Sequence, residues 1–137
     1  MSVILLRHAS AGDRDAWTGD DRARPLDAAG RADADALRGA MRATRVVSSP
    51  YVRCVETVEP LAASLGLEVE LDDRLAEGGS RAGALALLAE LDGGVACTHG
   101  DIVEAVLGAP LVKGAAVVLE LAGNEIRVLE RLPATSP

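Results

Sequence analysis

The stretch that decides the fold is Val3-Ile4-Leu5-Leu6-Arg7-His8, close to the start of the chain. Its four apolar residues are too few for a helix, and they lack the alternation of a strand with one exposed face. Such a run is typical of a strand that is buried on both faces of a parallel sheet. We therefore expect a buried strand whose carboxyl end presents a guanidinium, Arg7, and an imidazole, His8.

Two further segments repeat this arrangement. Residues 45–48 (RVVS) form a second short apolar run, which is followed by Arg53, and residues 95–98 (VACT) form a third, which ends at His99. In open α/β sheets the ligand crevice lies beyond the carboxyl ends of the strands. The only two histidines of the chain and two of its arginines are therefore predicted to face one edge of the sheet.

The rest of the chain alternates between strand-like and helix-like segments. Residues 67–71 predict an edge strand, and residues 115–121 and 125–129 predict a C-terminal hairpin. Helices are expected at residues 28–41 with Asp27 as cap, 50–66 with Ser49 as cap and a kink at Pro60, 82–91, and 102–107 with Asp101 as cap. The pattern predicts an α/β fold, a three-layer sandwich with a mostly parallel central sheet, an antiparallel C-terminal edge and helices on both faces.

Length and composition limit the class of protein. The 137 residues suit a single domain, expected at residues 1–132, with a disordered tail at 133–137. A formal net charge of −7 argues against a nucleic-acid partner and against an anionic membrane surface. Cys54 and Cys97 are too few for a disulfide framework and indicate a reducing compartment. No leader pattern and no apolar run of roughly 18 residues are present, so we expect a cytoplasmic protein. The oligomeric state cannot be inferred from the sequence.

The predicted cluster of basic side chains has the chemistry of an anion site. Guanidinium groups cannot lose their charge, and a phosphate removes the cost of packing them together because arginine binds its oxygens with two parallel hydrogen bonds. A neutral imidazole attacks phosphorus well, and a second, protonated imidazole stabilises charge on the transferred group. We expect no cofactor and no metal, since arginine and histidine supply the positive charge and no ligand spacing indicates zinc.

Four motifs, in this order along the chain, resemble those of the histidine phosphatase (phosphoglycerate mutase-like) superfamily. Leu6-Arg7-His8-Ala9 resembles its Arg-His-Gly/Ala signature, and residues 24–30 (RPLDAAG) are similar to a segment of the short, SixA-type phosphohistidine phosphatase branch. Residues 48–57 (SSPYVRCVET) resemble its Ser-Pro-x-x-Arg-x-x-x-Thr segment, and Thr98-His99-Gly100 resembles its second histidine motif. Two stretches, residues 53–63 and 113–119, also resemble the phosphatase-like domain that follows a Nudix domain in some MutT-type proteins.

The resemblance implies a role for each matching residue. His8 would become phosphorylated, with Arg7, Arg53 and His99 forming the phosphate pocket around it. Glu77 fits the place of a carboxylate proton donor after the third strand, and Asp101 is the alternative.

The loop at residues 10–25 is polar and contains Trp17. It either folds over the pocket and reads the substrate or forms a mobile surface loop with one packed tryptophan. Within it, Ser10 is a candidate hydrogen-bond donor to the phosphate.

These features together predict a phosphatase that works through a covalent phosphohistidine on His8. The expected substrate and partner is a phosphohistidine protein or a small phosphate ester or anhydride, and the absence of large insertions argues against a mutase. Two alternatives remain open. One is a non-catalytic module that binds phosphate or a partner, and the other is a phosphatase that acts on nucleotide products alongside a Nudix enzyme.

Overall fold

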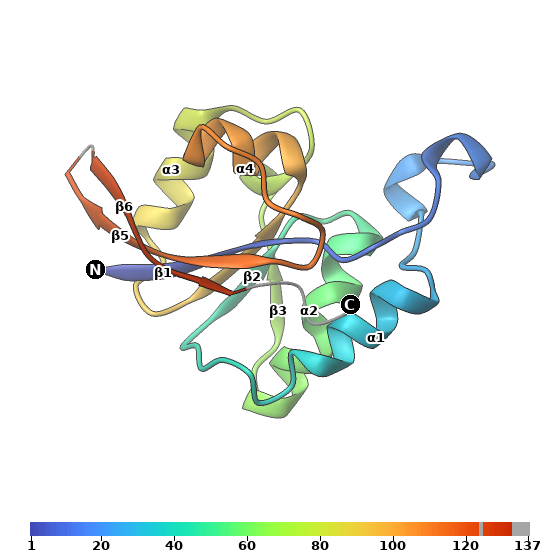
Figure 1. Ribbon diagram of the computed structural model, residues 1–137, viewed down its shortest axis with the longest axis horizontal. Helices are drawn as coiled ribbons and strands as arrows, with labels where there is room; N and C mark the ends of the chain where they lie inside the picture. Colours follow the sequence, from blue (N-terminus) through green and yellow to red (C-terminus); the bar gives the residue numbers. More distant parts are fainter. Residues whose placement is uncertain (124, 133–137) are drawn as a thin grey trace.

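The computed structural model describes residues 1–123 and 125–132, and within them one mixed sheet forms the centre of the molecule (Figure 1). The strand order is β3-β2-β4-β1-β5-β6. Neighbours among the first four strands of this order run parallel, whereas β5 is antiparallel to β1, and β6 is antiparallel to β5. The strands are β1 Ser2–Arg7, β2 Val46–Ser48, β3 Val69–Leu71, β4 Val95–Thr98, β5 Ala116–Ala122 and β6 Glu125–Leu132. The predicted α/β architecture, including its antiparallel C-terminal edge, is confirmed.

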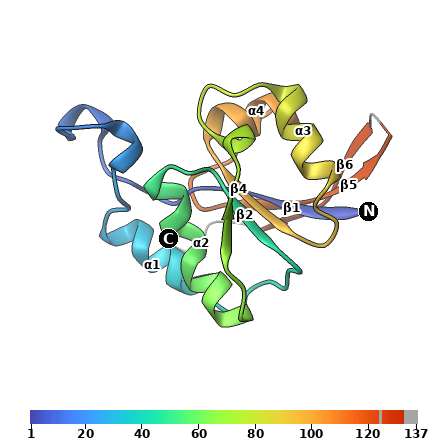
Figure 2. The ribbon, with the colours of Figure 1, turned by 180° about the vertical axis from the view of Figure 1, so that it is seen from behind.

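Helices cover both faces of the sheet. Helices α3 and α4 lie on one face and α1 and α2 on the other, an arrangement visible from both sides (Figures 1 and 2). Their bounds are α1 Ala28–Ala36, α2 Val52–Leu65, α3 Arg81–Ala89 and α4 Gly100–Leu107. Single 3₁₀ turns occur at η1 Arg14–Ala16, η2 Asp21–Ala23 and η3 Asp73–Leu75. Within the described residues, no helix combines the length and the apolar character needed to cross a membrane.

The core consists of two apolar layers, one on each side of the sheet. Leu5 of β1 belongs to the layer under α3 and α4, whereas Leu6 belongs to the layer that contains Cys54 and Leu61 of α2. Both leucines have no solvent exposure. Successive side chains of a strand point to opposite faces, so the unbroken apolar run of β1 fills both layers, as its sequence predicts.

The bounds of all four helices differ from the prediction, most of all at the end of α1. Helix α1 ends at Ala36 instead of continuing to residue 41, and the turns that follow contain Gly39 at a φ of 70°, a conformation that glycine adopts without strain. Helix α2 begins at Val52 with Tyr51 as its cap, so the prediction of a Ser49 cap is wrong. The Ser49 hydroxyl bonds instead to the buried ring of His99, which would otherwise lose a partner in the interior.

The cap predicted for the fourth helix is also wrong. His99 is the cap residue of α4, and Asp101 lies in the first helical turn, where its carboxylate accepts a hydrogen bond from the amide of Gly78. At the C-terminal edge, β6 continues to Leu132, beyond the expected end at residue 129, because it pairs with β5 along its length. The predicted tail at 133–137 and residue 124 of the predicted hairpin turn lie outside the described residues.

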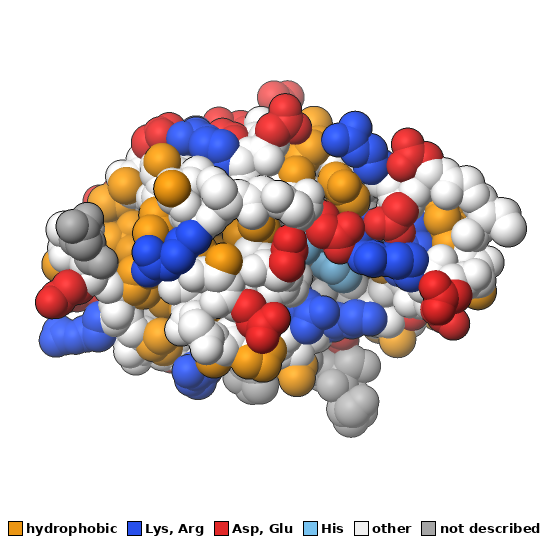
Figure 3. All heavy atoms as spheres, turned by 90° about the horizontal axis from the view of Figure 1, so that it is seen from above, with side chains coloured by type: hydrophobic (Ala, Val, Ile, Leu, Met, Phe, Trp, Pro, Cys, Tyr) orange, Lys and Arg blue, Asp and Glu red, His pale blue; other side chains and the backbone are white. Residues whose placement is uncertain are grey.

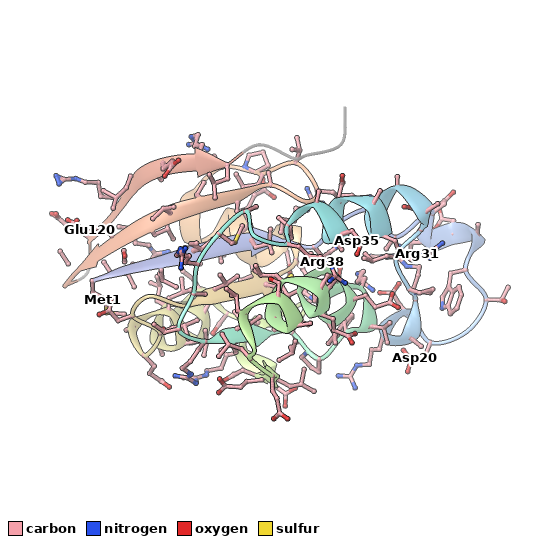
Figure 4. The ribbon with its side chains drawn as sticks, turned by 90° about the horizontal axis from the view of Figure 1, so that it is seen from below. Met1, Asp20, Arg31, Asp35, Arg38 and Glu120 are labelled. Carbon is pink, nitrogen blue, oxygen red and sulfur yellow. The ribbon has the colours of Figure 1, made fainter. Side chains whose placement is uncertain are left out.

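The register of the parallel strands brings their carboxyl ends together. Arg7 pairs with Thr98 across β1 and β4, and Ser48 pairs with Cys97 across β2 and β4. Met1 and Glu120 lie at the opposite end of the sheet from Asp20, which marks the protruding loop that follows β1 (Figure 4). The residues after β1, β2 and β4 therefore meet at one edge, beside this loop.

Candidate active site

A cavity of about 450 Å³ opens at this edge of the sheet. Arg7, His8, Glu77 and His99 line it, together with residues of the loop at 10–25 and with Lys113. On the surface, a histidine side chain is visible between acidic and basic side chains (Figure 3). The structure thus brings together both histidines, one of the two predicted arginines and the predicted carboxylate.

His8 is held in one tautomer by a short hydrogen bond. The side chain is 6% exposed, and its Nδ1 lies 2.7 Å from the carbonyl oxygen of Ala9. A carbonyl only accepts, so Nδ1 carries the proton and Nε2 keeps its lone pair. Burial lowers the pKa of His8 from 6.5 to about 3, and the charges of His99, Arg53 and Arg7 act in the same direction. The imidazole is therefore neutral at physiological pH, with Nε2 as its nucleophilic atom.

The Nδ1 atom of His99 is placed to act as a donor next to the nucleophile of His8, and it has no partner among the described residues. Its Nε2 lies 2.8 Å from the Ser49 hydroxyl oxygen, which itself accepts the amide N–H of Tyr51 at 3.3 Å. When the hydroxyl donates its hydrogen to Nε2, the proton of the neutral ring lies on Nδ1. That Nδ1 is buried and has no hydrogen-bond partner among the described residues. The rings of His8 and His99 are 5.4 Å apart between centroids, so this donor lies beside the nucleophile.

The guanidinium of Arg7 has one nitrogen that is anchored by a hydrogen bond and another that has no partner among the described residues. Its Nη1 donates to the carbonyl of Leu111 at 2.6 Å, and its Nε is buried without a partner within the described part of the chain. The guanidinium packs directly against Gly100, where a Cβ atom would lie only 2.9 Å from Nη2. Glycine at this position therefore makes room for the Arg7 side chain at the start of α4.

Arg53 is fully buried, but Asp21 covers its guanidinium. Nη1 donates to the Asp21 carbonyl at 2.8 Å and Nη2 donates to its carboxylate at 3.0 Å. The guanidinium carbon lies 4.9 Å from the centre of the Tyr51 ring, which packs edge-on against His99. Arg53 is thus near enough for its charge to act on His8, yet its Nη donors bond to Asp21 and it does not line the cavity.

Glu77 lies between two guanidinium groups. One carboxylate oxygen accepts from Arg14 Nη2 at 2.6 Å, and the other lies 3.5 Å from Arg53 Nη2. Asp101 also lines the cavity, but it accepts the amide N–H of Gly78 at 2.8 Å. Asp101 therefore holds the loop that carries Glu77, which makes Glu77 the better placed of the two candidate acids.

The family model that describes the histidine phosphatase superfamily (branch 1) matches residues 3–83, more than half of the chain. The chain belongs to the histidine phosphatase superfamily. It is 43% identical over 79 residues to an 8-oxo-(d)GTP phosphatase of Mycolicibacterium smegmatis, a match that covers 56% of this chain. The match covers 24% of the length of that relative.

Solved structures share the fold of this chain at low sequence identity. The protein histidine phosphatase SixA complexed with tungstate superposes with a TM-score of 0.76 and 22% identity, over 98% of this chain and 97% of SixA. A mycobacterial glucosyl-3-phosphoglycerate phosphatase superposes with a TM-score of 0.77 and 16% identity, over 96% of this chain and 99% of its own.

Ser10 has a different partner from the expected phosphate. Its hydroxyl donates to the Asp27 carboxylate at 2.6 Å, and the residue does not line the cavity. The loop at 10–25 does border the cavity, through Arg14 among other residues. Trp17 is 37% exposed, and its ring N–H donates to the carbonyl of Asp20 within the loop.

Three residues support the site although their roles were not identified from the sequence. Ser49 orients His99, Asp21 covers Arg53, and Thr57 accepts the buried amide N–H of Ala9 at 3.0 Å. Thr57 belongs to the motif at 48–57, which was the one available signal for it. Across the described residues, no group of three or more His, Cys, Asp or Glu side chains is arranged to hold a metal ion.

Proposed function

We propose that the chain is a phosphatase that transfers a phosphoryl group from its substrate to Nε2 of His8 and then to water. The observation that carries this proposal is the state of His8, which is neutral, buried and bonded through Nδ1, with Nε2 left as a free nucleophile. Family membership and the fold shared with SixA support it.

In the first half-reaction, Nε2 of His8 attacks phosphorus and the bond to the leaving group breaks. Arg7 Nε and His99 Nδ1 are buried and have no hydrogen-bond partner within the described part of the chain, so they are suited to bind the oxygens of the transferred group. Hydrogen bonds from preorganised donors stabilise the charge that develops on these oxygens. Glu77, on the cavity wall, is the group we assign to donate a proton to the leaving atom.

In the second half-reaction, water attacks the phosphorus of the phosphohistidine. Glu77 accepts a proton from this water, the P–N bond breaks, and the electron pair returns to Nε2 of His8. Inorganic phosphate leaves, and His8 is restored as the neutral imidazole that began the cycle.

Arg53 binds the transferred phosphoryl group after it releases Asp21. Asp21 presents to Arg53 two acceptor oxygens, its backbone carbonyl and one oxygen of its carboxylate, at the spacing that two phosphoryl oxygens could also occupy. We infer that an incoming phosphoryl group takes the place of the Asp21 carboxylate on Arg53, since both are acceptors for the same guanidinium fork.

The substrate belongs to one of two classes. Likeness to the fold of SixA favours a protein phosphohistidine, whereas the sequence relative favours a small phosphate compound, in particular a nucleotide. A phosphohistidine or a phosphoric anhydride has a leaving atom that needs little protonation, whereas a phosphate ester depends on the proton that Glu77 is assigned to donate.

The experiment is to trap the intermediate. The protein turns over p-nitrophenyl phosphate and is stopped in alkali, which preserves phosphohistidine, before peptide mass spectrometry. A phosphoryl group on the His8 peptide is expected in the native chain and in Arg127→Gln, an exposed control on β6, and it is expected to be absent in His8→Asn. Phosphate binding without turnover or modification would show instead a non-catalytic binding module.

A further inference from the structure

Lys113, the only lysine of the chain, lines the same cavity as His8 and His99. Its backbone position is tied to the nucleophile. The amide of Gly114, in the peptide bond that follows Lys113, donates to the carbonyls of Arg7 and His8 at 3.1 Å each. An ammonium group on a flexible stem is therefore anchored beside the strand end that carries His8.

Apart from Arg7, which belongs to the phosphate pocket itself, the other arginines that line the cavity have acidic partners. Arg14 pairs with Glu77 at 2.6 Å, and Arg24 pairs with Asp21 at 2.9 Å. Within residues 1–123 and 125–132, Lys113 forms no ion pair with any acid. Lys113 thus adds a positive charge to the cavity that no contact in the described structure neutralises.

Asp27 is the acid whose field Lys113 reaches, but its oxygens already have donors. One oxygen accepts from the Ser10 hydroxyl and the amide of Gly12, and the other accepts from the amide of Gly30. Hydrogen bonds from Ser10 and from Gly30 lower the pKa of Asp27, and the charge of Lys113 contributes to the same shift. With Asp27 engaged in this way, the Lys113 ammonium remains available to a ligand.

We propose that Lys113 forms a second anion subsite, for the phosphate that adjoins the transferred one, and that the substrates are phosphoric anhydrides of the nucleoside diphosphate class. This assignment rests on the proposed function, because the first phosphate is the one that His8 attacks. An anhydride places its second phosphate directly beside the first, and Lys113 lines the same cavity as His8. Lysine is a common point-charge partner for such a phosphate.

The reaction balances with water as the only co-reactant. Nε2 of His8 bonds to the terminal phosphorus, the bond from that phosphorus to the bridging oxygen breaks, and its electron pair stays on this oxygen. The leaving nucleoside monophosphate gains a charge that Lys113 stabilises, so this step depends little on protonation by Glu77. Water then converts the phosphohistidine to inorganic phosphate, releasing a proton.

The test compares guanosine diphosphate with p-nitrophenyl phosphate, which has no second phosphate. In Lys113→Gln, the ratio of kcat/KM for guanosine diphosphate to that for p-nitrophenyl phosphate is expected to fall roughly 10-fold, the effect of losing one charged hydrogen bond. Lys113→Arg should keep most of the ratio, and the control Arg127→Gln should keep all of it.

Several results would overturn the assignment. One is an unchanged ratio in Lys113→Gln, and another is a native chain that hydrolyses p-nitrophenyl phosphate but not guanosine diphosphate. A larger effect of Lys113→Gln on 3-phosphoglycerate than on guanosine diphosphate would show a carboxylate subsite instead. If neither compound is hydrolysed, the proposed function fails separately, and calorimetry still decides the subsite: Lys113→Gln must weaken binding of pyrophosphate more than that of inorganic phosphate.

Discussion

Replacing His8 with asparagine should make the fold less sensitive to mild acid. In the folded chain the pKa of His8 is about 3, because burial and neighbouring positive charges disfavour its protonated form, whereas its ordinary value is 6.5. As the pH falls below 6.5, the unfolded chain binds a proton at this residue and the folded chain does not. His8 therefore destabilises the fold increasingly between pH 6.5 and pH 3, and has little effect above pH 6.5.

The size of this effect follows from the two pKa values. Between pH 7 and pH 5, His8 should reduce the free energy of unfolding by about 2 kcal/mol, which is the linkage relation applied to these values. Asparagine does not titrate, so His8→Asn should lack this part of the acid sensitivity. The contributions of the other titrating groups are shared by both proteins and cancel in the comparison.

The assay is urea denaturation of the native chain and His8→Asn at pH 7 and pH 5, in buffers without phosphate. The native chain should lose about 2 kcal/mol more than His8→Asn over this interval. Equal losses in the two proteins would refute the reasoning, since they would mean that His8 takes up its proton in the folded state as readily as in the unfolded state.

Three further predictions concern the residues that hold the site. In Gly100→Ala, a Cβ placed 2.9 Å from Arg7 Nη2 should displace a guanidinium that is already anchored on Leu111. Steady-state kinetics should then show kcat/KM reduced on the order of 10-fold or more, whereas calorimetry should show that thermal stability is kept. Thr57→Val removes the acceptor of the buried Ala9 amide, so urea denaturation should show a loss of about 1–3 kcal/mol that Thr57→Ser does not share. Asp21→Asn removes a negative charge that competes for Arg53, so the inhibition constant of vanadate should fall roughly 5-fold; a weaker inhibition would show that Asp21 holds Arg53 in a productive position instead.

The strands of the sheet could be predicted from the sequence because a strand that is buried on both faces consists of a short, nearly continuous run of apolar residues. The apolar runs at residues 3–6 in β1 and 95–97 in β4 are each followed, one residue later, by a histidine. Parallel buried strands of this kind have their carboxyl ends at one edge. The convergence of His8 and His99 on one cavity therefore followed from local patterns alone.

The partners of the site residues could not be predicted in the same way. Ser49 has the sequence context of a helix cap, and its bond to His99 depends on two segments that meet only in the folded chain. The hydrogen bond from Arg53 to the Asp21 carboxylate likewise joins a helix to a loop, and no local sequence pattern predicts that contact. The partner of Asp101 could not be predicted either, because its hydrogen bond to Gly78 depends on how α4 packs beside the loop that carries Glu77.

The most direct test of the account is a crystal structure of the native chain with orthovanadate. The account predicts vanadium bonded to Nε2 of His8, with oxygens in hydrogen-bond contact with Arg7 and His99 Nδ1, and with Arg53 released from Asp21 to the vanadate. Vanadate bound elsewhere in the molecule, or bound in the cavity without contact to Nε2 of His8, would contradict it.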